Sequence, residues 1–241
     1  MPERISLDGI ADPAGPFKDA AERKLARVLG RQLTLQEKRI LERLGAEAVL
    51  ENLDNAFWNA ERASLTAALL VPLTEFVIES ANFAVESSPV GVDLGVLNEE
   101  AASWAEAHAG RLITQVSSTT QQNVARAVAR YVQTPDAEFR DLEKLIGTQF
   151  SKPRAQMIAV TEVTNAYDAG EQIVQRELMK QGVRVVRVWQ TMADERVCPI
   201  CKPLHDEAEE YPGGGFRGGL MGPAAHPRCR CWTIKQLVVE D

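Results

Sequence analysis

Two short clusters of cysteine and histidine near the C-terminus set the strongest limit on how this chain folds. The first is a Cys-x-x-Cys pair, and the second, beyond residues 202–225, is a His-x-x-Cys-x-Cys run. A two-residue gap lets both side chains of a tight turn face one ion, and thiolate and imidazole are ligands that tetrahedral Zn²⁺ selects. Together the clusters offer five candidate zinc ligands: Cys198, Cys201, His226, Cys229 and Cys231.

A closed tetrahedral site needs only four of these ligands. The spacing favours the set without Cys231, because His-x-x-Cys repeats the gap of the first pair. Cys231 then either replaces one of these ligands or lies beside the site. If this segment is a strand, Cys229 and Cys231 point to opposite faces, which argues against both of them binding the ion. Two disulfides or four free core thiols are the alternatives to a metal. We expect about one Zn²⁺ per chain, and we expect chelation to unfold the C-terminal region but not the helices before it.

A catalytic zinc is the alternative to a structural one, because it keeps one coordination position open beside a general base. The segment 205–207 reads His-x-Glu, as in zinc deaminases, but it follows the Cys-x-x-Cys pair instead of preceding it, and Val197 stands where those enzymes have proline. A closed structural site is therefore expected, contributing folding energy on the order of 10 kcal/mol. The acids near the clusters are Asp194, Glu195, Asp206 and Glu207.

The composition is that of a soluble globular protein with a core, since 45% of its 241 residues are hydrophobic and its net charge is −7. No run approaches the roughly 18 apolar residues of a membrane span, and the best candidate, residues 65–78, contains Pro72 and Glu75. Residues 1–5 lack the features of a secretory signal. We therefore expect a protein of the reducing cytoplasm, where disulfides are rare.

The segment before Gly182 is predicted to be helical almost throughout. Residues 34–37 and 118–121 have the capping-box pattern and predict two helix starts. Residues 69–84 place apolar side chains on one face of a long helix that Pro72 kinks or restarts, and this stripe favours a core-facing helix over a membrane or partner-binding surface.

Further helices are predicted to begin near Asn98 and near Asp136. The longest is expected to start at Ser151, with a proline in its first turn, and to run towards Lys180 before Gly182 ends it. Residues 183–189 are rich in valine and predict a strand. The predicted fold is thus a mainly α-helical body with a small C-terminal α+β zinc-binding module.

Three weaker features have simple interpretations. Residues 213–219 are glycine-rich but lack the following lysine and helix of a P-loop, so a flexible loop between the clusters is expected. Arg217, Arg228 and Arg230 suggest a small basic patch, although the net charge argues against nucleic-acid binding by the whole chain. His108 is assigned no function, because it is expected near the end of the Asn98 helix, where the dipole favours it.

The residues around both clusters resemble the C-terminal signature of phage head-morphogenesis proteins, the Mu F-like minor head family. The signature lies in residues 189–191, 194–201, 222–223 and 226–231, and the helix before it carries a second matching motif in residues 154–162. The resemblance covers about residues 110–235. It divides the chain into a variable N-terminal helical region (1–109), the helical part of the Mu F-like domain (110–182) and a strand plus zinc-knuckle module (183–241).

This resemblance implies a non-enzymatic component of the virion or prohead that is present in few copies, associates with the portal and acts in capsid assembly and DNA packaging or delivery. The implied partners are the portal and the major capsid or scaffold proteins, with phage double-stranded DNA as a weaker candidate, no membrane, and a homo-oligomer left open. Assembly would take place in the host bacterial cytoplasm. Because the chain ends at Asp241, soon after the signature, no appended toxin or peptidase domain is expected.

Arg154 and Glu162 lie two turns apart on one face of the predicted helix, where they either brace it against the strand and zinc module or form a plain surface salt bridge. Two other function classes stay open. One is an enzyme, either a zinc-containing nuclease with His205 as its base or an ADP-ribosyltransferase. The other is a stand-alone nucleic-acid-binding zinc module that uses Arg228 and Arg230.

Overall fold

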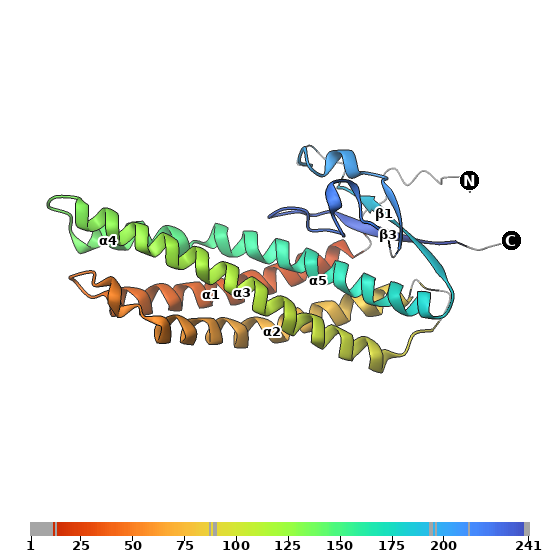
Figure 1. Cartoon of the computed structure of the whole chain (residues 1–241), viewed down its shortest axis with the longest axis horizontal. Coiled ribbons are helices and arrows are strands. Elements are labelled where there is room, and N and C mark those ends of the chain that lie inside the picture. Colours follow the sequence, from red (N-terminus) through yellow and green to blue (C-terminus); the bar gives the residue numbers. More distant parts are fainter. Residues whose placement is uncertain are drawn as a thin grey trace.

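The computed structural model describes residues 12, 14–86, 88, 91–192, 195, 197–211 and 213–238. Four long helices lie side by side along the longest axis, the short helix α4 lies at one end, and a small sheet lies beside α5 towards the other end (Figure 1). The helices are α1 (Gly15–Leu44), α2 (Asn55–Glu86), α3 (Leu94–Gln133), α4 (Phe139–Gly147) and α5 (Lys152–Lys180), and the strands are β1 (Arg184–Gln190), β2 (Ala208–Tyr211) and β3 (Trp232–Val238). Short 3-10 turns occur at Leu50–Asn52, Thr148–Phe150, Lys202–Leu204 and Arg217–Gly219.

Helix α2 packs against α1, α3 and α5. Its stripe Leu69, Leu73, Phe76 and Val77 is buried, as expected for a core-facing helix. Pro72 lies inside the helix without dividing it, so the predicted restart is wrong. By length and composition alone α2 is apolar enough to cross a membrane, but 44% of its apolar window is buried against the other helices.

Both predicted capping boxes lie inside helices, so these helix starts are wrong. Thr34 and Thr120 donate their hydroxyl hydrogens to the carbonyls of Gly30 and Val116 in the preceding turn, which satisfies them without a cap. Helix α3 is instead capped by Asp93, whose carboxylate accepts a hydrogen bond from the Gly95 amide at 2.7 Å, so Asn98 lies within the helix. Helix α4 starts at Phe139, after the cap residue Glu138.

The boundaries of α5 agree with the sequence. The helix begins after Ser151 with Pro153 in its first turn, and Gly182 follows its end with a φ of 83°, which glycine adopts without strain. At 29 residues it is shorter than α3, which has 40. Helix α3 also runs unbroken across residues 109 and 110, where the resemblance begins.

The crossing of α5 over α2 is close enough to require glycine at residue 170. A Cβ atom there would lie 2.6 Å from both the Val77 carbonyl oxygen and the Ser80 Cβ. We expect Gly170→Ala to lower the free energy of unfolding by about 1–3 kcal/mol. Gly110→Ala is the matched control, because its Cβ on α3 would meet nothing within 4 Å, and it should raise stability by about 0.5–1 kcal/mol. Urea denaturation of both variants measures the difference, and equal effects would contradict the close crossing.

The sheet confirms the predicted strand and adds two that the sequence did not indicate. Strand β1 lies in the middle and pairs antiparallel with β2 on one side and with β3 on the other. Among the described residues after Gly182 there is no α-helix, only strands, loops and 3-10 turns, so the C-terminal part is not an α+β unit of its own. The sheet supports the two loops that carry the cysteines.

Candidate metal centre

The first cysteine pair is held in a tight turn after β1. The amides of Cys201 and Lys202 donate to the carbonyl oxygen of Cys198 at 3.1 and 2.9 Å. The Cys201 amide also donates to the Cys198 sulfur at 3.4 Å. The turn therefore presents both sulfurs on the same side.

The second cluster forms a similar turn, in which the Cys229 amide donates to the His226 carbonyl at 3.1 Å. The imidazole Nδ1 of His226 lies 2.8 Å from the carbonyl oxygen of Pro227, and because a carbonyl only accepts, Nδ1 carries the hydrogen. This leaves Nε2 with a free lone pair, as a metal-binding histidine requires.

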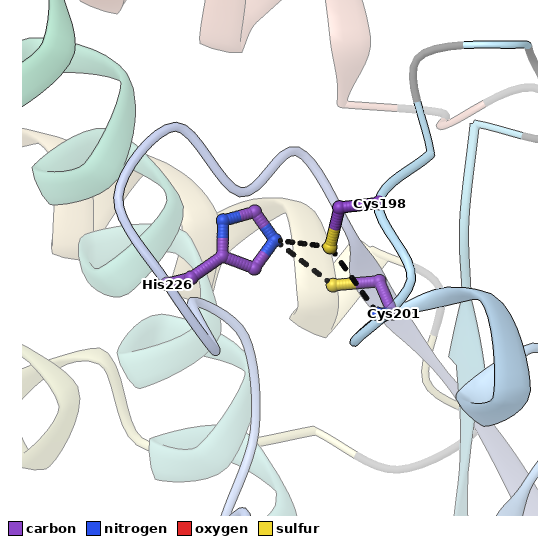
Figure 2. A group of neighbouring side chains, drawn as sticks. All are labelled: Cys198, Cys201 and His226. Carbon is purple, nitrogen blue, oxygen red and sulfur yellow. Dashed lines mark hydrogen bonds between the residues drawn. The ribbon is translucent and has the colours of Figure 1, made fainter.

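The two turns bring their side chains together. The Nε2 atom of His226 lies 3.0 Å from the Cys198 sulfur and 3.2 Å from the Cys201 sulfur, and Figure 2 shows the ring pointing at both. The sulfur of Cys229 lies 3.8 Å from that of Cys201. The donor atoms form two groups, each within 4.8 Å: Cys198, Cys201 and His226, and Cys201, Cys229 and Cys231.

Cys201 is the member common to both groups, and it is buried. The expected divergence of Cys229 and Cys231 does not occur, because they precede β3 and lie in a loop, where the alternation of strand side chains does not apply. All four cysteines are free, so neither of the two proposed disulfides is formed.

Each donor group fits three positions of a zinc site, whereas Cys198, Cys201, His226 and Cys229 are not all within 4.8 Å of one another. Tetrahedral Zn²⁺ with Zn–S bonds of about 2.3 Å places its sulfurs about 3.8 Å apart, as found between Cys201 and Cys229. The sulfur-to-Nε2 distances are somewhat shorter than the roughly 3.6 Å edge of such a site. Thiolate and imidazole donors select Zn²⁺ over the harder ions Ca²⁺ and Mg²⁺.

The cysteines affect one another's protonation. A hydrogen bond from Cys231 lowers the pKa of Cys229, and the same bond raises the pKa of Cys231. Burial raises the pKa of Cys201 to about 12. Because metal ligands must be deprotonated, the lowered pKa makes Cys229 more ready than Cys201 or Cys231 to bind a metal at neutral pH.

A small apolar cluster surrounds the sulfurs and is separate from the helical core. It contains Trp189 from β1, Leu204 and Phe216, together with three of the cysteines, and the Trp189 and Phe216 rings meet edge to face at 5.1 Å. So few apolar side chains bury little surface, which is why a metal ion would contribute a large share of the folding energy here.

The loop 222–229 is attached to one face of α5. Thr161 accepts a hydrogen bond from the Arg228 amide at 3.0 Å, Thr164 donates to the Cys229 carbonyl at 2.8 Å, and Asn165 accepts from the Ala224 amide at 3.2 Å. One turn further along, Gly222 packs so closely on Asp168 that a Cβ would lie 2.9 Å from the carboxyl carbon. Positions 161, 164, 165 and 168 share one helix face, so α5 sets the place of the second ligand turn.

Comparison with known families identifies the chain. The family model of the phage Mu protein F like proteins matches residues 109–234, which is more than half of the sequence. The chain belongs to this family. No curated protein and no solved structure matched. Membership indicates a role in phage head morphogenesis together with other virion proteins, and it is consistent with a structural protein.

Arg154 and Glu162 of the Mu F-like helix motif make neither of the two contacts expected of them, which were a brace against the strand and zinc module and a salt bridge to each other. Arg154 donates to the Gln149 carbonyl at 2.6 Å and to Thr120 of α3 at 3.1 Å, and it does not pair with Glu162. Glu162 lies 2.5 Å from Nε2 of His108, in the middle of α3. Both residues thus brace α5 against α3, not against the sheet, and the assignment of His108 to a helix end is wrong.

The remaining predicted side chains of the Mu F-like module are dispersed. Nδ1 of His205 accepts from the Thr191 amide at 3.2 Å, and His205 belongs to neither donor group. The three arginines have separate partners: Arg217 lies 3.7 Å from Glu207, Arg230 lies 3.7 Å from Glu22, and Arg228 bonds α5. Glu195 is exposed, and Asp194 lies outside the described residues.

The sequence reasoning missed Thr164, Asn165 and Gly222. The two family motifs could have pointed to them. Thr164 and Asn165 closely follow the helix motif 154–162, and Gly222 is part of the C-terminal signature.

We expect Thr164→Val to weaken zinc binding about tenfold, because it removes the hydrogen bond to the backbone of Cys229 while keeping the side-chain volume. Competition with a chromophoric chelator measures the affinity. Thr66→Val is the matched control, since the Thr66 hydroxyl bonds only the Arg62 carbonyl of its own helix. Equal zinc affinity in wild type and Thr164→Val would show that α5 does not position the ligand turn.

Proposed function

We propose that this protein is a minor head protein of the phage particle that associates with the portal and acts in capsid assembly and in DNA packaging or delivery. The observation that supports this most is the extent of the family match, which includes α5, strands β1 and β2, the start of β3 and both metal-ligand turns. Portal, major capsid and scaffold proteins are the proposed partners. The proposed location is the prohead and virion, after assembly in the host cytoplasm.

We also propose that one structural zinc ion binds to Cys198, Cys201, His226 and Cys229, with Cys231 beside it as a hydrogen-bond donor to Cys229. The ligand distances, the orientation of His226 and the hydrogen bond between the two cysteines support this set. Bound zinc would link the turn after β1 to the loop on α5. The proposed divisions of the chain are the helical region 1–109, the helical part 110–182 and the zinc module 183–241. Helix α3 spans the boundary between the first two.

Quantitative mass spectrometry of purified proheads and virions tests the proposed role. The chain should be present at a few to about a dozen copies per particle relative to portal and major capsid subunits. Absence from both particles, with abundant protein in the cytosol, would contradict the minor head role. Assays for divalent-metal-dependent nicking of DNA, with His205→Ala as a control, would then become the next test.

A further inference from the structure

A cavity of about 530 Å³ lies beside the candidate metal centre, between α1, α5 and the two ligand turns. Cys198, Cys201 and His226 form part of its wall. Its volume is within the range of sites that hold a small ligand or a few side chains of a peptide.

Positive charge dominates the polar lining of this cavity. Arg23 from α1 and Arg228 and Arg230 from the second ligand turn face one carboxylate, that of Glu22. Glu22 lies 3.7 Å from Arg230, whereas no carboxylate among the described residues lies within ion-pair distance of Arg23 or Arg228. A centre of Zn²⁺, three thiolates and one imidazole carries one negative charge, so an excess of positive charge remains even with zinc bound. This is notable in a chain whose net charge is −7.

The backbone of Arg228 has a strained conformation that contacts with α5 hold in place. Arg228 has a φ of 63°, a left-handed conformation that costs a non-glycine residue about 1 kcal/mol or more. The strained residue is held by its amide, which donates to Thr161, and its guanidinium donates to the Pro153 carbonyl at 3.3 Å. Glycine would remove the strain, but it would also remove the cation from the cavity.

Ala26, Val160 and Val197 contribute aliphatic surface to the lining, and Gln156 adds a polar side chain. None of the described lining residues is Phe, Tyr or Trp, and the imidazole ring of His226 points at the sulfurs of Cys198 and Cys201. Binding of single-stranded nucleic acid relies on aromatic side chains on which bases stack, so this cavity does not fit a nucleobase. Aliphatic surface next to guanidinium groups fits a peptide in which carboxylates alternate with aliphatic side chains, because arginine binds carboxylates through two parallel hydrogen bonds.

We propose that this cavity binds an acidic peptide segment of a partner protein, with carboxylates on Arg23 and Arg228 and an aliphatic side chain against Val160. This inference rests on the proposed function, since it names the chemistry by which another head protein would be recognised. The metal centre then has a second role, because it holds Arg228 and Arg230 on the loop that forms one side of the cavity.

Fluorescence polarisation with the zinc-loaded full-length chain tests this proposal. The probe is a short fluorescein-labelled peptide in which leucine and glutamate alternate, and the matched probe has glutamine at every glutamate. We expect the acidic peptide to bind, the glutamine peptide to bind at least about tenfold more weakly, and added salt to weaken the first interaction. Arg23→Gln and Arg228→Gln should each weaken binding about tenfold.

Arg217→Gln is the matched control, because Arg217 belongs to the same module, pairs with Glu207 and does not line the cavity. Zinc content is measured for every variant. If Arg228→Gln disrupts the loop, Arg23→Gln still tests the proposal, because Arg23 is on α1 and not on the loop. Equal binding of both peptides, no binding of the acidic peptide, or tighter binding of a single-stranded oligonucleotide would overturn the proposal. An Arg228→Gln variant that loses zinc affinity but keeps peptide binding would also overturn the proposal, because the arginine would then only offset the charge of the thiolates. None of these results depends on the copy number in particles, which tests the minor head role separately.

Discussion

Cys201→Ser is expected to abolish zinc binding and to unfold the segment after residue 197, while the helices of the body remain folded. Cys201 is the donor shared by both ligand groups, so neither group keeps three donors without it. Its replacement removes a metal whose contribution is on the order of 10 kcal/mol, far more than the small cluster around Trp189 and Phe216 supplies. The sheet would then lose the loops that cover it.

Zinc content by mass spectrometry and amide hydrogen exchange measure this result. Exchange protection should be lost in the loops and in β2 and should persist in α2 and α3. Cys231→Ser is the matched control, since the proposed ligand set leaves Cys231 out, and it should retain about one zinc per chain. A metal-free protein whose C-terminal part keeps its protection would contradict the structural role of the metal.

Glu209→Gln is expected to lower the free energy of unfolding by about 3–5 kcal/mol. Glu209 on β2 and Arg187 on β1 are both buried and lie 2.5 Å apart, and the arginine also lies 5.2 Å from the centre of the Phe216 ring. Removing the carboxylate takes the ion-pair partner on β2 away from a buried guanidinium, whose charge also acts on the buried carboxyl group of Asp168. The second carboxylate oxygen also accepts from the Gly215 amide, which ties the glycine-rich loop to the sheet.

The neighbouring pair provides a control of the same chemistry. Arg184 and Glu210 occupy the same two strands and also lie 2.5 Å apart, but both are exposed to solvent. Glu210→Gln should therefore cost less than about 1 kcal/mol. Urea denaturation of the two variants, with zinc bound, compares the pairs. Similar losses would mean that burial does not determine the value of the Arg187–Glu209 pair.

Several elements were predictable because their signals are local. The valine-rich strand and the limits of α5 follow from backbone preferences of the residues themselves, as Pro153 and Gly182 illustrate. The two metal-ligand turns follow from spacing alone, since a two-residue gap between ligands is a property of one turn. The helix starts predicted at Thr34 and Ser118 are wrong, because polar side chains of both patterns bond the preceding turn inside a continuous helix, as Thr34 and Thr120 do.

The family, the candidate ligands and the helical character of the body were therefore contained in the order of the residues. Folding in three dimensions decided which distant side chains meet: His108 with Glu162, Arg154 with Thr120, Thr164 with the backbone of Cys229, and Arg23 with Arg228 at one cavity. Strands β2 and β3 became visible only through their pairing with β1. The physical reason is that local signals depend on neighbours along the chain, whereas these contacts depend on how α1, α3 and α5 pack, which is set by the fit of whole apolar faces.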